Sequence, residues 1–273
     1  MRMDLDFTGR HVFVFGGTTG INFGIAQAFA RCGAHVSVAS RKRENVDAAL
    51  ARLADMAREE GLKGRAQGFC ADVRDFDAVG TALADAAVRR GAIDVLVSGA
   101  AGNFLCPANA MSANGFRTVV DIDLVGSFNV LRQAWPHLRR PGASLINITA
   151  PQASVPMRGQ AHAAAAKAGI DQLTRVLALE WGGEGVRVNA ISPGPIDGTE
   201  GFRKLMARTP EERARAQADV PLGRFGTLDD IANLALFLAS PYAGYISGAV
   251  IPCDGGGALE SVKPALERAA LQP

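Results

Sequence analysis

The sequence lacks an excess of charge of either sign and has no long apolar run. Lysine and arginine together number 29 against 27 aspartates and glutamates, which leaves a net charge of +2. So small an excess argues against the basic surface that binds nucleic acids or anionic membranes. No stretch of 18 apolar residues marks a membrane span, and residues 1–10 are charged, without the apolar core of a leader peptide.

Cysteine and histidine are scarce, with four of each. The cysteines (Cys32, Cys70, Cys106 and Cys253) are far apart and form no Cys-x-x-Cys pair, so we expect neither a disulfide framework nor a metal site. The final residues, 271–273, are not an address of the Ser-Lys-Leu type. These absences lead us to expect a cytoplasmic protein without a metal.

Short apolar, β-rich runs alternate with longer helical patterns, which predicts a parallel sheet covered by helices on both faces. We expect strands near His11–Phe15, His35–Ala39, Ala66–Ala71, Ile93–Val97, Ser144–Ile148, Arg187–Ile191 and Ala249–Pro252. We expect helices near Ile21–Arg31, Glu44–Glu60, Phe76–Arg89, Asn114–Leu138, His162–Trp181 and Leu228–Leu238. The predicted fold is therefore α/β: one Rossmann-type, doubly wound domain over residues 1–273 with a seven-stranded parallel sheet. Residues 201–219, polar and rich in arginine, are expected to form a substrate lid, and residues 258–273 a C-terminal tail.

A glycine-rich turn follows the first predicted strand and reads Gly16-Gly17-Thr18-Thr19-Gly20-Ile21-Asn22. Glycines at a strand-to-helix turn let backbone N–H groups approach a pyrophosphate at the positive end of the following helix. Any tight turn can contain such glycines, but a preceding strand and a following helix are the context that a dinucleotide site requires.

The residues after the second predicted strand distinguish NAD from NADP. An NAD site presents a carboxylate to the ribose 2′-hydroxyl at this point. This chain instead has Ser40-Arg41-Lys42-Arg43, with no carboxylate before Glu44. The planar guanidinium of Arg41 matches a 2′-phosphate, whereas a merely solvated basic cluster would be unfavourable at a helix N-terminus. We therefore expect NADPH as the cofactor.

Together with Lys167 and the stretch Asn189–Ile196, this turn resembles the short-chain dehydrogenase/reductase family from near the N-terminus to about Gly257. The resemblance implies that Asp72 and Val73 hold the adenine and that Lys167 holds the nicotinamide ribose. An alternative for Asp72 is a cap of the following helix. The expected cofactor-binding residues are Gly16, Thr18, Thr19, Gly20, Ile21, Arg41, Asp72, Val73, Ala101, Lys167, Pro193, Gly194 and Ile196.

The chain departs from the family pattern where the chemistry is usually done. Family members carry a tyrosine four residues before the lysine and a serine thirteen before that tyrosine, but these places hold Ala163 and Ala150. Asn22 stands where the family has glycine, and Ser98-Gly99 where it has two asparagines. Either the chemistry differs from carbonyl reduction or there is none.

Three stretches are similar to a narrower branch, the peroxisomal-type 2,4-dienoyl-CoA reductases: Ala100–Ala108, Asn147–Ala150 and Pro193–Gly201. That branch also lacks the tyrosine and serine, keeps the lysine, and has aspartate at the place of Asp123. The resemblance implies NADPH-dependent reduction of a 2,4-dienoyl acyl-CoA thioester, with hydride transfer to the δ carbon and protonation of the dienolate at the α carbon. It also implies a homotetramer.

Asp123 and Lys167 are the expected catalytic residues. A dienolate carries its charge on a remote thioester oxygen, so the acid cannot occupy the usual tyrosine position. We expect Asp123 to supply the proton, directly or through a water ordered with Lys167. A structural aspartate bonded to a nearby loop is the alternative. His162 is a second candidate acid, although a histidine at a helix start is more typical of a partly exposed packing residue.

Asn103, Phe104 and Arg203 are the expected substrate residues. Donors near Asn103 and Phe104 would stabilise the enolate oxygen, and the Phe104 ring would pack on the diene or simply belong to the core. Arg203 would meet a CoA phosphate or remain solvated. Two other functions stay open: a reductase of another enoyl or carbonyl substrate that uses Asp123 or His162, and a catalytically silent NADPH-binding protein. Retention of Lys167 argues against silence.

Overall fold

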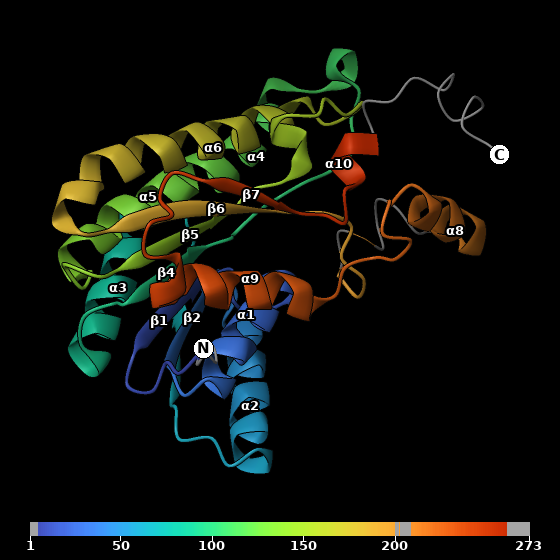
Figure 1. Ribbon diagram of the computed structural model, residues 1–273. Helices are drawn as coiled ribbons and strands as arrows, with labels where there is room; N and C mark the ends of the chain where they lie inside the picture. Colours follow the sequence, from blue (N-terminus) through green and yellow to red (C-terminus); the bar gives the residue numbers. More distant parts are fainter. Residues whose placement is uncertain (1–4, 200–201, 203–208, 261–273) are drawn as a thin grey trace.

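The computed structural model describes residues 5–199, 202 and 209–260 (Figure 1). Its strands are β1 (His11–Phe15), β2 (His35–Ser40), β3 (Ala66–Cys70), β4 (Val95–Ser98), β5 (Ser144–Ile148), β6 (Arg187–Pro193) and β7 (Val250–Cys253). Its α-helices are α1 (Gly20–Arg31), α2 (Arg43–Glu59), α3 (Phe76–Arg90), α4 (Ala113–Val120), α5 (Gly126–Ala134), α6 (Ala161–Trp181), α8 (Pro210–Ala218), α9 (Leu228–Ala239) and α10 (Gly257–Glu260). Shorter turns are η1 (Ala108–Ala110), η2 (Asp121–Val125), η3 (Trp135–His137), η4 (Pro151–Ala153), η5 (Gly182–Glu184) and η6 (Pro241–Ala243).

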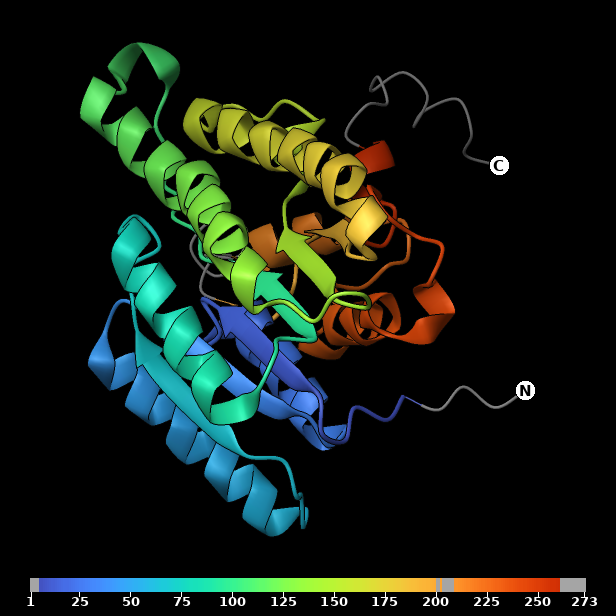
Figure 2. The same ribbon diagram turned by 90° about the vertical axis from the view of Figure 1, so that its left-hand side faces the viewer.

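The strands form one parallel sheet in the order β3-β2-β1-β4-β5-β6-β7. Alternate residues of each strand point to opposite faces. In β1, Val12 and Val14 join a core cluster with α1, α2 and α9, while Phe13 and Phe15 join a second cluster with α3 and α5. Figure 2 shows the helices of the second cluster, α3 and α5, in front of the sheet. The predicted doubly wound, seven-stranded parallel sheet is thus confirmed.

The helix predicted over Asn114–Leu138 runs without a break from Ala113 to His137, but its hydrogen-bond pattern changes along its length. It is divided into α4, the π-helical turn η2, α5 and the 3-10 turn η3. Gly126, just after η2, packs so closely on Val73 that a Cβ there would lie 2.5 Å from Val73 Cγ2. A π turn inserts an extra residue into the helix. Its side chains therefore point in directions that they would not take in a regular α-helix. The predicted helix is confirmed in its extent, but hydrophobic periodicity does not reveal the inserted π turn.

Strand β4 begins later than the Ile93 that we expected, because Ile93 forms only an isolated bridge with Leu138. All strands of a parallel sheet end at the same edge, and strand order reverses beside β1, which lies between β2 and β4. Ligands bind outside the carboxyl ends of strands at such a switch point. Figure 1 shows α8, part of the segment predicted as a lid, beyond this edge. Within the described residues, no helix is both long and apolar enough to cross a membrane.

Candidate active site

The glycine turn between β1 and α1 has the geometry of an anion site. Gly16 (φ 72°) and Gly20 (φ 56°) both have positive φ values, which favour glycine. Thr19, the N-cap of α1, makes no side-chain capping bond, and the first turn has no acidic residue. Among the described residues, the first backbone N–H groups of α1, including that of Ile21, therefore have no side-chain capping partner at the positive end of the helix. This arrangement fits a cofactor pyrophosphate.

The side chain of Asn22 packs directly against the backbone of Gly99. A Cβ on Gly99 would lie 2.2 Å from Asn22 Oδ1, so the Asn22 side chain fills the space that a side chain at position 99 would need. Asn22 Nδ2 also donates to the Gly99 carbonyl at 2.7 Å. The two departures from the family pattern, at positions 22 and 99, therefore compensate for each other. Together they connect α1 to the loop that follows β4. Asn22 Oδ1 is buried and accepts no hydrogen bond from the described residues.

Three basic and acidic side chains gather near the ends of β2 and β3. Arg41 follows β2 and is exposed. Asp72 forms an ion pair with Arg74 at 2.6 Å; the hydrogen bonds from Arg74 lower the pKa of Asp72, and the charge of Arg41 lowers it further. The N-cap of α3 is Asp75, whose carboxylate accepts from two backbone N–H groups, so the capping alternative for Asp72 was wrong. Val73 is buried against the start of α5.

Four further predicted cofactor residues lie at strand ends. Thr18 is buried within the glycine turn, and Ala101 is exposed just after β4. Pro193 is the last residue of β6. A Cβ on the following Gly194 would lie 2.5 Å from the Cα of Asp254, so only glycine allows this approach of two chain segments. The structure thus brings these residues to the edge where the glycine turn lies.

Thr199, which the sequence analysis did not single out, faces the glycine turn from the loop after β6. Its Cγ2 lies 3.9 Å from the position of a Cβ on Gly20. Its hydroxyl donates to the carbonyl of Ile196 at 2.9 Å, and Ile196 is buried. Thr199 belongs to the stretch that resembles the reductase branch, which was the available signal.

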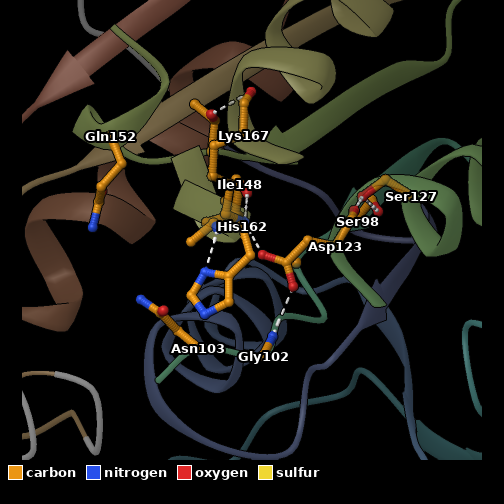
Figure 3. Close-up of polar contacts among 12 residues, drawn as sticks. Ser98, Gly102, Asn103, Asp123, Ser127, Ile148, Gln152, His162 and Lys167 are labelled. Carbon is orange, nitrogen blue, oxygen red and sulfur yellow. Dashed lines mark hydrogen bonds and ion pairs between the residues drawn. The ribbon is translucent and has the colours of Figure 1, made fainter. Parts of the chain in front are cut away.

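Asp123 and Lys167 form a buried ion pair, with 3.3 Å between Nζ and Oδ2 (Figure 3). Asp123, on η2, is 1% exposed and Lys167, on α6, is 8% exposed, so a surface lysine is excluded. Lys167 Nζ also donates to the Ile148 carbonyl at 3.1 Å, and the Gly102 N–H donates to Asp123 Oδ1 at 2.7 Å. Asp123 therefore bonds to a nearby loop, as the structural alternative expects, and also faces the lysine.

His162 is fully buried, so the expectation of a partly exposed packing residue was wrong. The loop after β4 covers this helix start: the rings of Phe104 and His162 meet edge to face with 4.4 Å between centroids. The Ala163 N–H donates to Nδ1 at 2.6 Å, while Nε2 has no hydrogen-bond partner in the part of the chain that the structure describes. Burial lowers the pKa of His162, although the charge of Asp123 opposes this shift.

Three side-chain amides meet beside His162. Asn103 Nδ2 donates to Gln160 Oε1 at 2.9 Å, and Gln152 Nε2 donates to the same oxygen at 3.1 Å. Neither glutamine was predicted; their only sequence signal is their place between β5 and α6. Phe104 is 40% exposed, so it is not a plain core residue. Arg203 lies outside the described residues.

No tyrosine replaces the missing acid. The only two tyrosines of the chain, Tyr242 and Tyr245, lie between α9 and β7, at the opposite edge of the sheet. Ala163 is buried beside Lys167, and Ala150 directly precedes η4. Among the described residues, no group of three or more His, Cys, Asp or Glu side chains could hold a metal ion.

Both the sequence and the fold have well-matched relatives. Residues 16–257 match the family described as Enoyl-(Acyl carrier protein) reductase. A peroxisomal 2,4-dienoyl-CoA reductase of Pongo abelii, described as (3E)-enoyl-CoA-producing, is 44% identical over 89% of this chain and 82% of its own length. A probable 2,4-dienoyl-CoA reductase of Bacillus subtilis, described as (2E)-enoyl-CoA-producing, is 39% identical over 90% of this chain and 95% of its own. The crystal structure of a short chain dehydrogenase from Bacillus anthracis superposes with a TM-score of 0.82 and 36% identity, covering 91% of this chain and 96% of that one.

Proposed function

Because the chain belongs to the short-chain dehydrogenase/reductase family, we propose that it is an NADPH-dependent 2,4-dienoyl-CoA reductase. Enzymes of this family use NAD(P)H. The observation that carries the proposal is the buried Asp123–Lys167 pair, which stands beside Ala163, where carbonyl reductases have tyrosine. The names of the relatives from Pongo abelii and Bacillus subtilis support the same substrate class.

The proposed reaction needs a proton donor away from the tyrosine position. When bound, NADPH supplies a hydride, which goes to the δ carbon of the dienoyl thioester. The electron pairs shift so that negative charge collects on the thioester oxygen, and a proton must then reach the α carbon. That proton gives the (3E)-enoyl product, whereas protonation at the γ carbon would give the (2E) isomer.

Asp123 and Lys167 are the proposed catalytic residues. Both carboxylate oxygens of Asp123 already accept hydrogen bonds or an ion pair, from the Gly102 N–H and from Lys167. This geometry favours delivery through a water held by the pair over direct transfer from the carboxyl. Backbone and side-chain donors near Asn103 and Phe104 would stabilise the developing enolate oxygen.

The fit of the cofactor depends on the elements at the carboxyl edge of the sheet. The uncapped start of α1 suits the pyrophosphate, and the guanidinium of Arg41 suits the 2′-phosphate, since no carboxylate competes for that place. Residues 201–219, of which the structure describes 202 and 209–219, are proposed as the substrate lid. A cytoplasmic location is also part of the proposal, supported by four cysteines that are all free.

A homotetramer is the proposed assembly. Helices α5 and α6 expose large apolar side chains, including Phe128 (46%), Val176 (39%) and Leu179 (84%). Phe128 also lines a groove with Trp135 and Trp181. An apolar surface of this kind on helices that cover a sheet is typical of contact with another subunit.

The deciding experiment is NADPH oxidation with 2,4-hexadienoyl-CoA and 2,4-decadienoyl-CoA, with the product identified by NMR. We expect both substrates to be reduced to (3E)-enoyl-CoA. Reduction of only a simple enoyl-CoA or a ketone would favour another reductase. NADPH binding without reduction of any of these compounds would support a silent NADPH-binding protein.

A further inference from the structure

We propose that His162 is a neutral hydrogen-bond donor whose Nε2–H binds the thioester oxygen of the acyl-CoA substrate. The inference rests on the proposed function, because reduction of a conjugated acyl thioester places negative charge on an oxygen remote from the hydride acceptor. The sequence predicted that donors near Asn103 and Phe104 stabilise the enolate oxygen. The inference assigns this role to the side chain of His162.

The protonation state of His162 follows from its first contact. The Ala163 backbone N–H donates to Nδ1 at 2.6 Å, so Nδ1 must present its lone pair. The ring proton therefore lies on Nε2. A second proton, on Nδ1, would confront the Ala163 N–H, and burial also lowers the pKa of His162. The ring is consequently a neutral donor and a poor general acid.

The Nε2–H group is a donor without an adequate acceptor. Nε2 is buried and has no hydrogen-bond partner in the described part of the chain. The Phe104 backbone also interacts with the ring and raises the pKa of His162, but Nε2 is left without a hydrogen bond of ordinary geometry. A buried donor left in this state costs stability, which a ligand oxygen recovers. A negatively charged oxygen recovers more than a neutral one, since charge-assisted hydrogen bonds are stronger.

The His162 ring lies beside the proposed catalytic pair and under the loop after β4. Figure 3 shows His162 between the Asp123 carboxylate and Asn103. The loop that covers the ring is held just before Phe104, by the bond from Gly102 to Asp123 and by the bond from Asn103 to Gln160. Phe104, the residue after these two anchors, covers His162 edge on and is 40% exposed. Because residues 99–107 form no helix or strand, rotation of Phe104 would open Nε2 to a ligand.

The roles of the two sides of the site are then distinct. As hydride adds to the δ carbon, the conjugated electron pairs move toward the thioester, and its oxygen becomes the anion that accepts from His162 Nε2–H. His162 keeps its proton throughout. The α carbon takes a proton from the side of Asp123 and Lys167, the carbonyl re-forms, and the hydrogen bond to His162 weakens again. Such binding is stronger in the transition state than in the ground state, which is what accelerates a reaction.

Three variants test the role of His162 in turnover. His162→Leu removes the donor at similar size, His162→Gln places an amide N–H at a similar reach, and His137→Leu is the control on η3, outside the site. We expect kcat for 2,4-hexadienoyl-CoA to fall roughly 10²- to 10³-fold in His162→Leu. His162→Gln should recover most of the loss, and His137→Leu should match the parent. NADPH affinity, measured by fluorescence titration, should stay unchanged in all three. Parent-like kcat in His162→Leu would overturn the inference.

A spectroscopic measurement tests the same contact without turnover. A hydrogen bond to the carbonyl oxygen polarises the conjugated dienoyl group and shifts its absorption to longer wavelength. We expect this shift for 2,4-hexadienoyl-CoA bound together with NADP⁺ to the parent and to His162→Gln, and its loss in His162→Leu. Equal shifts in the parent and His162→Leu would overturn the inference but leave the proposed function intact. A shift that depends on His162 in a parent that reduces no dienoyl-CoA would support the contact and overturn the proposed function.

Discussion

Lys167 carries the only side-chain cation that the structure places within ion-pair distance of Asp123 among the described residues. Removing two charges from water is costly unless they are paired and otherwise hydrogen-bonded. Here the pair is completed by the Ile148 carbonyl and the Gly102 N–H. At the scale of single residues, the site is therefore a buried ion pair whose polar atoms bond to each other and to the neighbouring backbone. Substitutions at single positions in and around it have distinct consequences.

Asp123→Asn keeps the size of the side chain but removes its negative charge and its ability to hold or pass a proton. We expect dienoyl-CoA reduction to fall by roughly 10²-fold or more, the usual scale for general acid–base catalysis. NADPH affinity should barely change, because Asp123 is not among the proposed cofactor-binding residues. Steady-state kinetics and fluorescence titration measure the two effects. Near-full activity of Asp123→Asn would reject Asp123 as a catalytic residue.

Arg41 should determine the choice of cofactor. We expect NADPH to bind at least about tenfold more tightly than NADH, a difference of about 1.4 kcal/mol. Arg41→Ala should remove most of this preference, because the guanidinium matches only the 2′-phosphate. The neighbouring Lys42→Ala is the matched control. Equal affinities of the parent for NADH and NADPH in a fluorescence titration would contradict the assignment.

The interlocked pair Asn22 and Gly99 predicts strong non-additivity. Gly99→Asn alone should destabilise the protein and abolish NADPH binding, because its Cβ would lie 2.2 Å from Asn22 Oδ1. Asn22→Gly alone should lose the hydrogen bond to Gly99 and weaken binding. The double variant should recover much of both losses, since each change makes room for the other. Thermal denaturation and NADPH titration complete the cycle, and additive losses would show that the two residues are independent.

At the scale of elements, the site depends on how helices begin and where they are interrupted. Helix α1 begins without a cap and offers its N–H groups to a ligand, whereas α9 begins with a complete capping box formed by Thr227 and Asp230. The contrast is physical: α9 packs against α1 in the core and needs its own partners, while an uncapped N-terminus at the sheet edge is useful only when an anion binds.

Asp230→Ala should therefore cost stability in a way that depends on pH. Hydrogen bonds from Arg224 and from the Thr227 backbone hold the pKa of Asp230 well below its ordinary value of 3.8. Because the pKa is lowered in the folded state, the carboxylate stabilises the fold at pH values above its ordinary pKa. This contribution is lost progressively as the pH falls below that pKa toward the lowered pKa of the folded state. We expect a loss of about 1 kcal/mol at neutral pH, the usual value of an N-terminal cap. Denaturant unfolding of parent and variant should converge in acid; a difference that persists there would contradict the assignment.

At the scale of the whole molecule, the two sides of the sheet differ. The core cluster with α1, α2 and α9 supports the cofactor turn, while α5 and α6 on the other side present exposed apolar side chains next to the π turn that holds Asp123. Assembly through this surface would bury α6, the helix that carries Lys167 and His162. Subunit contact and the catalytic group would then be mechanically connected.

Phe128→Glu is expected to disrupt the proposed tetramer. Phe128 is 46% exposed on α5, and a buried, unpaired carboxylate at an interface is unfavourable. Light scattering after gel filtration should show a smaller species with unchanged circular dichroism. Val88→Glu, on α3, is the control, because Val88 is 87% exposed outside this surface. An unchanged mass for Phe128→Glu would exclude α5 from the interface, and a monomeric parent would exclude the tetramer.

The sequence by itself determined the features that are local. The alternation of apolar runs predicted the parallel sheet, and the glycines after β1 predicted the turn, in which Gly16 and Gly20 have positive φ. Ala150 and Ala163 showed that the usual acid is absent. These conclusions hold because strand periodicity and glycine conformation depend on residues close together in the chain. The identity of each residue is read directly from the sequence.

Only the tertiary structure decided what lies against what. The π turn that points Asp123 at Lys167, the burial of His162 under Phe104, and the filling of the Gly99 space by Asn22 all join segments far apart in the chain. Neither hydrophobic periodicity nor a motif contains this information, because burial and hydrogen-bond partners depend on packing between elements. For this protein the chemistry depends on those contacts, since its motif lacks the customary tyrosine and serine.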